Sequence, residues 1–240
     1  MPLVPIDGVP TWHDVAGAGE PVVLLHGGLS HSGAMRPLGR LLAERRRVHA
    51  FDRRGHGATP RAGAPFTYAA MGHEAVRFLE EVVGGPAHLV GWSDGAVAAV
   101  LAALERPDLV RRIVAIDQYL ALEGAPNPEG FDASMREHAT RERLRAAFAR
   151  RSPEPRAFDA ALEDSLRLWR TEPAFDLARL ERLRSPVLLL TADDGEVLPD
   201  HAAALVARIP VAEHRTLPGT HLLPLESPEA VAAAVEDWLD

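Results

Sequence analysis

The chain of 240 residues contains no cysteine. Disulfide bonds, a thiolate nucleophile and a cysteine-ligated zinc site are therefore excluded. Positively charged residues are also fewer than negatively charged ones: the chain has 26 Lys and Arg residues and 34 Asp and Glu residues, which gives a net charge of -8. Such a chain has no overall positive field that would draw it to nucleic acid or to anionic lipid. We therefore expect neither to be a partner.

Long apolar runs are missing as well. No run approaches the roughly 20 residues that a membrane span needs. The N-terminal segment Met1–Asp7 has neither the basic nor the long apolar region of a signal peptide. The apolar fraction of 47% is ordinary for a globular protein, and this length suits one well-packed domain. We expect a cytoplasmic protein, monomeric or homodimeric, with no membrane partner.

Short apolar segments alternate with segments of helical periodicity. The strand-like segments are Pro21–His26, Arg47–Asp52, Ala87–Trp92, Arg112–Asp117 and Pro186–Thr191. Helical periodicity is clearest in Tyr68–Val83, Ala96–Glu105 and Ala230–Leu239. This alternation predicts an α/β fold with a mainly parallel sheet and helices on both faces. In such sheets the functional residues gather beyond the carboxyl ends of the strands.

Residues 120–184 interrupt the alternation, because no convincing strand occurs there. Phe158, Leu162, Leu166 and Trp169 follow helical spacing and give one helix an apolar face. We interpret this segment as a small helical lid inserted into a core that comprises residues 1–119 and 185–240.

The strongest functional motif is Gly-Trp-Ser-Asp-Gly at positions 91–95. It follows a predicted strand and precedes a predicted helix, which is the setting of a nucleophile elbow. Small neighbours are needed on that sharp turn, and the helix N-terminus favours developing negative charge. The alternative is a glycine-rich connection with an unreactive serine. We expect Ser93 to be a nucleophile.

A second glycine-rich turn, His26-Gly27-Gly28, ends another strand. We expect the backbone N–H groups of Gly28 and Asp94 to form an oxyanion hole. The Asp94 carboxylate has two possible roles: it caps the following helix or faces bulk solvent, or it faces the cleft under the lid.

The general base is expected at His221. Of the eleven histidines, it is the one that follows the last strand-like segment and precedes the final helix. The order of serine, acid and histidine along the chain then suits the elbow architecture. We expect Trp92, beside the serine, and Trp169, in the lid, to contact a small-molecule substrate.

With these motifs in order, the chain resembles the α/β-hydrolase fold superfamily over essentially its whole length. The segment Asp52–Gly57 resembles a turn that shapes the cleft wall in that superfamily. The Trp-Ser-Asp form of the elbow resembles small bacterial serine esterases and the biphenyl-hydrolase-like group. The resemblance implies a Ser-His-Asp triad that needs no metal and no cofactor.

The acid of the triad departs from the pattern of that superfamily. The acid usually follows the strand that here is Val187–Thr191, as Gly-x-x-Asp with a proline four residues on. This chain has Gly195 where that Asp would align, followed by Pro199. We prefer Asp194, one residue earlier. The alternatives are Asp193, Glu196 and Asp117, the last of which ends the preceding strand.

These features predict a serine hydrolase that cleaves a small ester-type substrate through an acyl-enzyme, as a carboxylesterase does. The same triad also serves lactonases, thioesterases, C–C hydrolases and perhydrolases. A further alternative is a non-catalytic ligand-binding or accessory protein whose triad has decayed.

Overall fold

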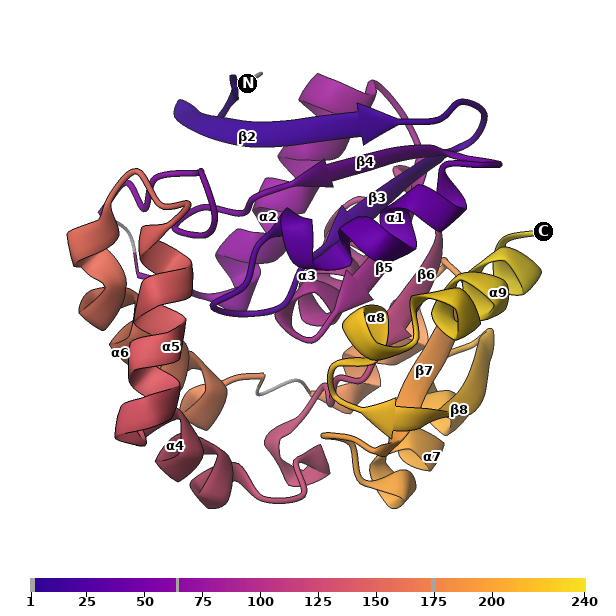
Figure 1. The fold of residues 1–240 in the computed structure, drawn as a ribbon. Helices are drawn as coiled ribbons and strands as arrows, with labels where there is room; N and C mark the ends of the chain where they lie inside the picture. The colour runs from indigo at the N-terminus through magenta and orange to yellow at the C-terminus, as the bar shows by residue number, and fades with distance from the viewer. Residues whose placement is uncertain (1–2, 64, 174–175) are drawn as a thin grey trace.

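An eight-stranded sheet runs through the molecule (Figure 1). The structure is a computed structural model and describes residues 3–63, 65–173 and 176–240. The strand order is β1-β2-β4-β3-β5-β6-β7-β8. The six strands from β4 to β8 in this order are parallel to one another, whereas β1 pairs antiparallel with β2 and β2 pairs antiparallel with β4. The strands span Leu3–Ile6 (β1), Val9–Ala16 (β2), Pro21–Leu25 (β3), Arg47–Phe51 (β4), Ala87–Trp92 (β5), Val110–Ile116 (β6), Val187–Asp194 (β7) and Ala212–Thr220 (β8).

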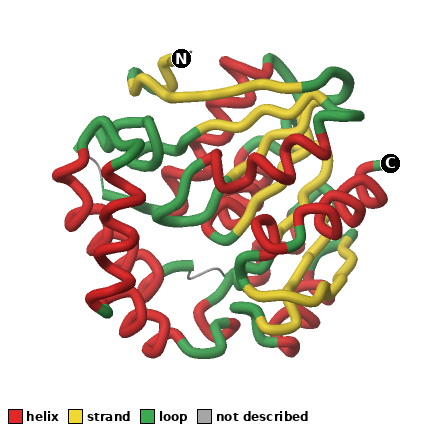
Figure 2. Tube along the Cα trace, in the orientation of Figure 1, coloured by secondary structure: helices red, strands yellow, loops and turns green. Residues whose placement is uncertain are grey.

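Helices cover both faces of this sheet (Figure 2). Successive side chains of a strand point to opposite faces, so Val22 and Leu24 join one buried cluster while Val23 and Leu25 join the other. One face carries α1 (Arg36–Leu42), α8 (Leu223–Glu226) and α9 (Pro228–Leu239); the other carries α2 (Tyr68–Phe78), α3 (Asp94–Glu105) and α7 (Pro199–Arg208). The predicted α/β fold with its mainly parallel, doubly covered sheet is confirmed. In the described part of the chain, no helix is long and apolar enough to span a membrane.

The N-terminal hairpin of β1 and β2 is an addition to the predicted strands. Asp7 and Gly8 connect these strands with φ values of 47° and 77°. Two successive residues with positive φ form the tight turn that suits the twist of a hairpin, and an Asp-Gly pair is typical of it. Only four residues of β2, His13 to Ala16, pair with β4.

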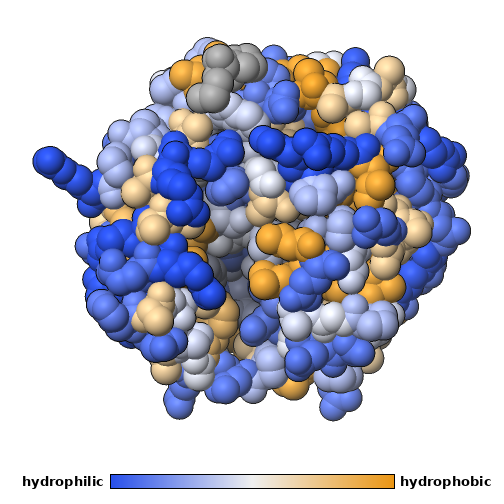
Figure 3. Space-filling view, in the orientation of Figure 1, coloured by the Kyte–Doolittle hydropathy of each residue, from blue (hydrophilic) through white to orange (hydrophobic). Residues whose placement is uncertain are grey.

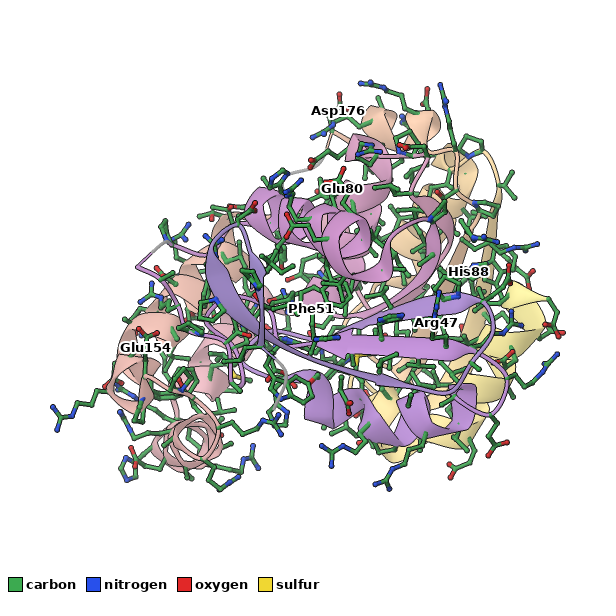
Figure 4. The ribbon with its side chains drawn as sticks, turned by 90° about the horizontal axis from the view of Figure 1, so that it is seen from above. Arg47, Phe51, Glu80, His88, Glu154 and Asp176 are labelled. Atoms are coloured by element: carbon green, nitrogen blue, oxygen red, sulfur yellow. The ribbon has the colours of Figure 1, made fainter. Side chains whose placement is uncertain are left out.

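Between β6 and β7 the described residues form three α-helices, which we call the insertion helices: α4 (Pro128–Arg136), α5 (His138–Ala149) and α6 (Phe158–Thr171). The α6 side chains of Phe158, Leu162 and Leu166 make a small buried cluster of their own. Seen from above, Arg47 at the start of β4, Phe51 at its end and Glu154 of the insertion follow one another across the molecule (Figure 4). The insertion helices therefore lie beyond the carboxyl ends of the strands.

Candidate active site

Ser93 occupies a strained turn between β5 and α3. Its φ of 55° and ψ of -128° are unusual for a residue with a side chain. The turn is fixed by a 3.0 Å hydrogen bond from Ser93 N to the carbonyl oxygen of Ile116. Gly91 and Gly95 permit the turn, because a Cβ on Gly91 would overlap Gly95 O and one on Gly95 would overlap Leu25 O. This backbone presents the Ser93 side chain at the end of the sheet, as an elbow requires.

His221 follows β8 and lies against the end of β6. Its Nδ1 donates to Asp117 Oδ2 over 2.8 Å. The indole N–H of Trp92 donates to the carbonyl oxygen of His221 over 2.7 Å, and the two rings lie 5.7 Å apart. Both the backbone and the ring of His221 are thus held. An Nδ1–H that donates to a carboxylate leaves Nε2 free to accept a proton.

The carboxylate on His221 is therefore that of Asp117, and not that of the preferred Asp194. Asp194 ends β7 with an exposed side chain and pairs in register with Thr220. The neighbouring Asp193 accepts the Gly219 N–H over 2.8 Å. Asp117 was one of the alternatives left open by the sequence. It follows β6, and His221 follows β8, which is separated from β6 only by β7, so the two side chains meet at the same end of the sheet.

Asp117 is fully buried and well supplied with donors. Its Oδ1 accepts the Ala192 N–H and its Oδ2 accepts the Glu196 N–H, both over 2.9 Å. Burial alone would raise the pKa of Asp117, but His221 and these two N–H groups hold the pKa below its ordinary value. A Cβ on Gly195 would overlap the Asp117 carboxylate. Glycine at the position where the superfamily has its acid therefore leaves room for the acid from β6.

Gly28 and Asp94, the expected oxyanion donors, lie close to each other beside Ser93, because a Cβ on Gly28 would overlap the Asp94 carboxylate and one on Gly27 would lie 3.2 Å from Ser93 Cβ. Asp94 is the first residue of α3, so its N–H has no acceptor within the helix. Among the hydrogen bonds between described residues, none uses the Gly28 N–H. Buried Arg53 supports this loop, because its Nη2 donates to the carbonyl oxygens of His26 and Gly27 over 2.6 and 3.0 Å.

The turn that begins at Asp52 holds the same loop from outside. The buried Asp52 carboxylate accepts the Ser32 N–H over 2.8 Å, the Ser32 hydroxyl over 2.6 Å and the Ala58 N–H over 2.8 Å. The segment Asp52–Gly57, expected to shape the cleft wall, thus ties the loop after β3 to the loop after β4.

A cavity of about 350 Å³ joins these elements. Gly28, Trp92, Ser93, Asp94 and His221 line it from the core. The insertion helices contribute five apolar or aromatic side chains and three charged ones: Phe131, Met135, Leu144, Leu166 and Trp169, with Asp132, Arg143 and Arg170. The space-filling view shows a recess between the mainly polar surface of the insertion helices and an apolar surface beside it (Figure 3). Both predicted substrate-contacting tryptophans therefore face one cavity with Ser93.

Gln118 and Tyr119 also line this cavity and were not singled out in the sequence, whereas Glu196, on the same wall, was considered there only as a candidate acid. Burial and the nearby carboxylates of Asp94 and Glu196 raise the pKa of Tyr119 to about 12, so its hydroxyl keeps its proton at neutral pH. Gln118 and Tyr119 directly follow a strand end, the signal that could have identified them. Among the described residues, no group of three or more His, Asp or Glu side chains is placed to hold a metal ion.

Comparisons with known proteins agree with this architecture. A 2-(acetamidomethylene)succinate hydrolase of Mesorhizobium japonicum is 28% identical over 260 residues, covering 93% of this chain and 89% of that protein. A Caulobacter vibrioides protein provisionally named carbamate hydrolase RutD is 28% identical, covering 93% and 91%. The magnesium-chelatase 30 kDa subunit of Rhodobacter capsulatus is 27% identical, covering 95% and 89%.

Solved structures show the same fold. The serine hydrolase CarC, involved in carbazole degradation, superposes with a TM-score of 0.82 at 22% identity, over 99% of this chain and 97% of that one. The enol-lactonase of Burkholderia xenovorans LB400 gives a TM-score of 0.79 at 18% identity, over 99% of both chains. The model of the alpha/beta hydrolase family matches residues 22–234. The chain belongs to the alpha/beta hydrolase family.

Proposed function

We propose that this hydrolase is a serine hydrolase that cleaves a small ester-type substrate, with Ser93 as nucleophile, His221 as general base and Asp117 as the acid that orients it. The observation that carries the proposal is the 2.8 Å contact between His221 Nδ1 and the buried Asp117 carboxylate, in the same cavity as the strained Ser93. A histidine fixed in this way is oriented for proton transfer.

The chemistry follows from these positions. His221 Nε2 takes the Ser93 proton while Ser93 Oγ attacks the carbonyl carbon, and the backbone N–H groups of Gly28 and Asp94 stabilise the oxyanion. His221 then protonates the leaving group, which departs and leaves an acyl-enzyme. Water repeats the sequence, releases the acid and restores Ser93. Asp117 stays ionised throughout and stabilises the imidazolium.

The insertion helices suit the role of a lid over the acyl group. Five of their eight side chains in the cavity are apolar or aromatic, and the other three, Asp132, Arg143 and Arg170, are charged. An acyl group of modest size would pack against Phe131, Leu144 and Trp169 while its carbonyl reaches Ser93. We therefore propose p-nitrophenyl esters of short and aromatic acids as first substrates.

Covalent labelling tests the nucleophile. A fluorophosphonate should modify the protein at Ser93, and hydrolysis of a p-nitrophenyl ester should fall by at least a thousandfold in Ser93→Ala. Peptide mapping by mass spectrometry identifies the labelled residue. Protein that is folded yet neither labelled nor active would instead favour a non-catalytic accessory role.

The curated relatives favour a second candidate on the same site. Two of them carry names that contain an acetamido group or a carbamate, so each name describes a carbonyl carbon bonded to nitrogen. Cleavage of such a bond needs the same nucleophile and a proton for the leaving nitrogen, and His221 can supply that proton. Comparing kcat/KM for an ester, a carbamate and an N-acyl enamine of matched acyl group separates the two candidates.

A further inference from the structure

The carboxylate of Asp94 faces the insertion helices. It is buried, with only 2% exposed, although it begins a helix beside the cavity. Its Oδ1 accepts two hydrogen bonds, from the Tyr68 hydroxyl over 2.8 Å and from the Trp169 indole N–H over 2.9 Å. Tyr68 belongs to the core and Trp169 to α6. One carboxylate oxygen thus joins the core to an insertion helix at the residue that follows the nucleophile.

Gly28 packs against both ends of this link. A Cβ on Gly28 would overlap Asp94 Oδ2 and would lie 2.6 Å from Trp169 Cζ2. Trp169 therefore lies next to both residues whose N–H groups are proposed to hold the oxyanion. Because packed side chains transmit small displacements, a shift of the indole changes the space available to Gly28 and the orientation of Asp94.

Other contacts fix the same end of α6 to the core. Arg167 Nη2 donates to the carbonyl oxygen of Phe66 over 2.7 Å, and Glu172 Oε2 accepts the Tyr68 N–H over 3.1 Å. These contacts converge on the start of α2, where Tyr68 also reaches Asp94. The position of α6 is thus set at the residues that surround the oxyanion donors.

A negative charge beside an oxyanion would by itself oppose catalysis. Here the fully buried guanidinium of Arg53 offsets it: burial lowers the pKa of Arg53, and attraction by Asp94 acts in the opposite direction. The two hydrogen bonds to Oδ1 stabilise the carboxylate charge where it is. The arrangement therefore suits a structural link better than a source of electrostatic repulsion.

We propose that Asp94 is a positioning residue that couples helix α6 to the oxyanion hole through Trp169. An acyl group that packs against the Trp169 indole holds Asp94 and Gly28 in the geometry that receives the oxyanion. The fit of the acyl group then controls kcat as well as binding. This inference rests on the proposed function, because it assigns a role within the same reaction.

Trp169→Phe keeps an aromatic ring and removes the N–H donor. We expect kcat for an aromatic ester to fall about tenfold with KM within about twofold, because oxyanion donors act in the transition state. A residue that only lines the pocket would raise KM instead. Trp238→Phe, on α9 and remote from the cavity, is the matched control and should leave kcat unchanged.

Two substitutions of Asp94 define the link. Asp94→Leu removes the acceptor and should lower kcat about a hundredfold, whereas the amide oxygen of Asp94→Asn can still accept from Tyr68 and Trp169 and should recover most of that loss. The double variant Trp169→Phe/Asp94→Leu should be no slower than Asp94→Leu alone, because both changes break the same link. An aryl boronic acid, whose tetrahedral adduct places an oxygen in the hole, should lose affinity in parallel with kcat.

Thermal unfolding of each variant identifies failures of folding. Additive losses in the double variant, or an unchanged kcat in Trp169→Phe, would overturn the link. If Asp94→Asn lowers kcat as much as Asp94→Leu does, the negative charge of Asp94 matters and the hydrogen-bonded link is wrong. Failure of the proposed function has a different signature, since the unsubstituted protein would then neither turn over esters nor react with a fluorophosphonate.

Discussion

Ser93 and Asp117 are both held in a left-handed backbone conformation at the ends of adjacent strands. Their φ values are 55° and 45°. For residues with a side chain this costs roughly 1–3 kcal/mol each. Each N–H donates to the next strand along the sheet: Ser93 to Ile116 O over 3.0 Å, and Asp117 to Leu190 O over 2.8 Å. The parallel sheet thus holds two strained residues in place, Ser93 at the cavity and Asp117 against His221.

Replacement of Asp117 by Asn tests the acid. The amide cannot stabilise the His221 imidazolium, and its NH2 group would face a backbone N–H of Ala192 or Glu196. We expect kcat to fall by about 10³–10⁴, together with some loss of thermal stability. The matched control is Asp194→Asn, whose exposed side chain should leave kcat within about twofold. A large loss in Asp194→Asn and a small one in Asp117→Asn would contradict the contact with His221.

At the scale of the element, the insertion helices have a small core of their own. Leu162, 1% exposed, packs with Phe158 and Leu166. Leu162→Ala should remove about 2–4 kcal/mol of packing from this cluster. These three residues form a cluster distinct from the two on the sheet, although Ala161 and Leu168 of α6 belong to one of those. We therefore expect loosening to be greatest in the insertion: faster amide hydrogen exchange in residues 128–171, measured by mass spectrometry, and a raised KM.

Leu189→Ala, in the centre of β7, is the comparison for that variant. Leu189 is 3% exposed and belongs to a cluster on the sheet. The Leu189→Ala substitution should lower the midpoint of global unfolding without a selective increase of amide hydrogen exchange in the insertion helices. If Leu162→Ala instead lowers the global midpoint with uniform exchange, then the insertion helices and the core unfold as one unit.

Elements with a strong local pattern could be predicted from the sequence. The strand Ala87–Trp92 has the predicted bounds. The helix predicted over Tyr68–Val83 is continuous, with α2 followed by a π-helical turn that ends at Gly84. Strand β2 was not predicted, because its burial pattern is irregular and it contains Pro10.

The triad acid could not be read from the sequence with the same certainty. Several carboxylates follow strand ends, and which of them reaches His221 depends on how β6 lies beside β7. That pairing joins residues more than 70 positions apart. The glycine at position 195 was visible in the sequence, but its meaning, room for Asp117, required the fold.

For the molecule as a whole, several titratable groups are buried behind the site. Burial lowers the pKa of His26 well below its usual range and that of His56 to about 3, and the charge of Arg53 adds to both shifts. Glu74 is buried too, and burial raises its pKa to about 7. The two histidines are therefore neutral in the folded protein over a pH range in which the unfolded chain takes up protons.

Acidification from pH 6.5 to 4.5 should therefore destabilise the protein. In this window the unfolded histidines bind protons that folded His26 and His56 do not, which lowers the free energy of unfolding by up to about 1.4 kcal/mol per pH unit for each. Glu74 offsets the destabilisation due to one histidine, because it stays protonated in the folded state at a pH where it is ionised in the unfolded chain. Urea denaturation at pH 7.5, 6 and 5 measures the slope. We expect His56→Gln to flatten this slope and Glu74→Gln to steepen it. A free energy of unfolding that rises as the pH falls from 6.5 to 5, in the unsubstituted protein and in Glu74→Gln alike, would contradict the burial of neutral histidines.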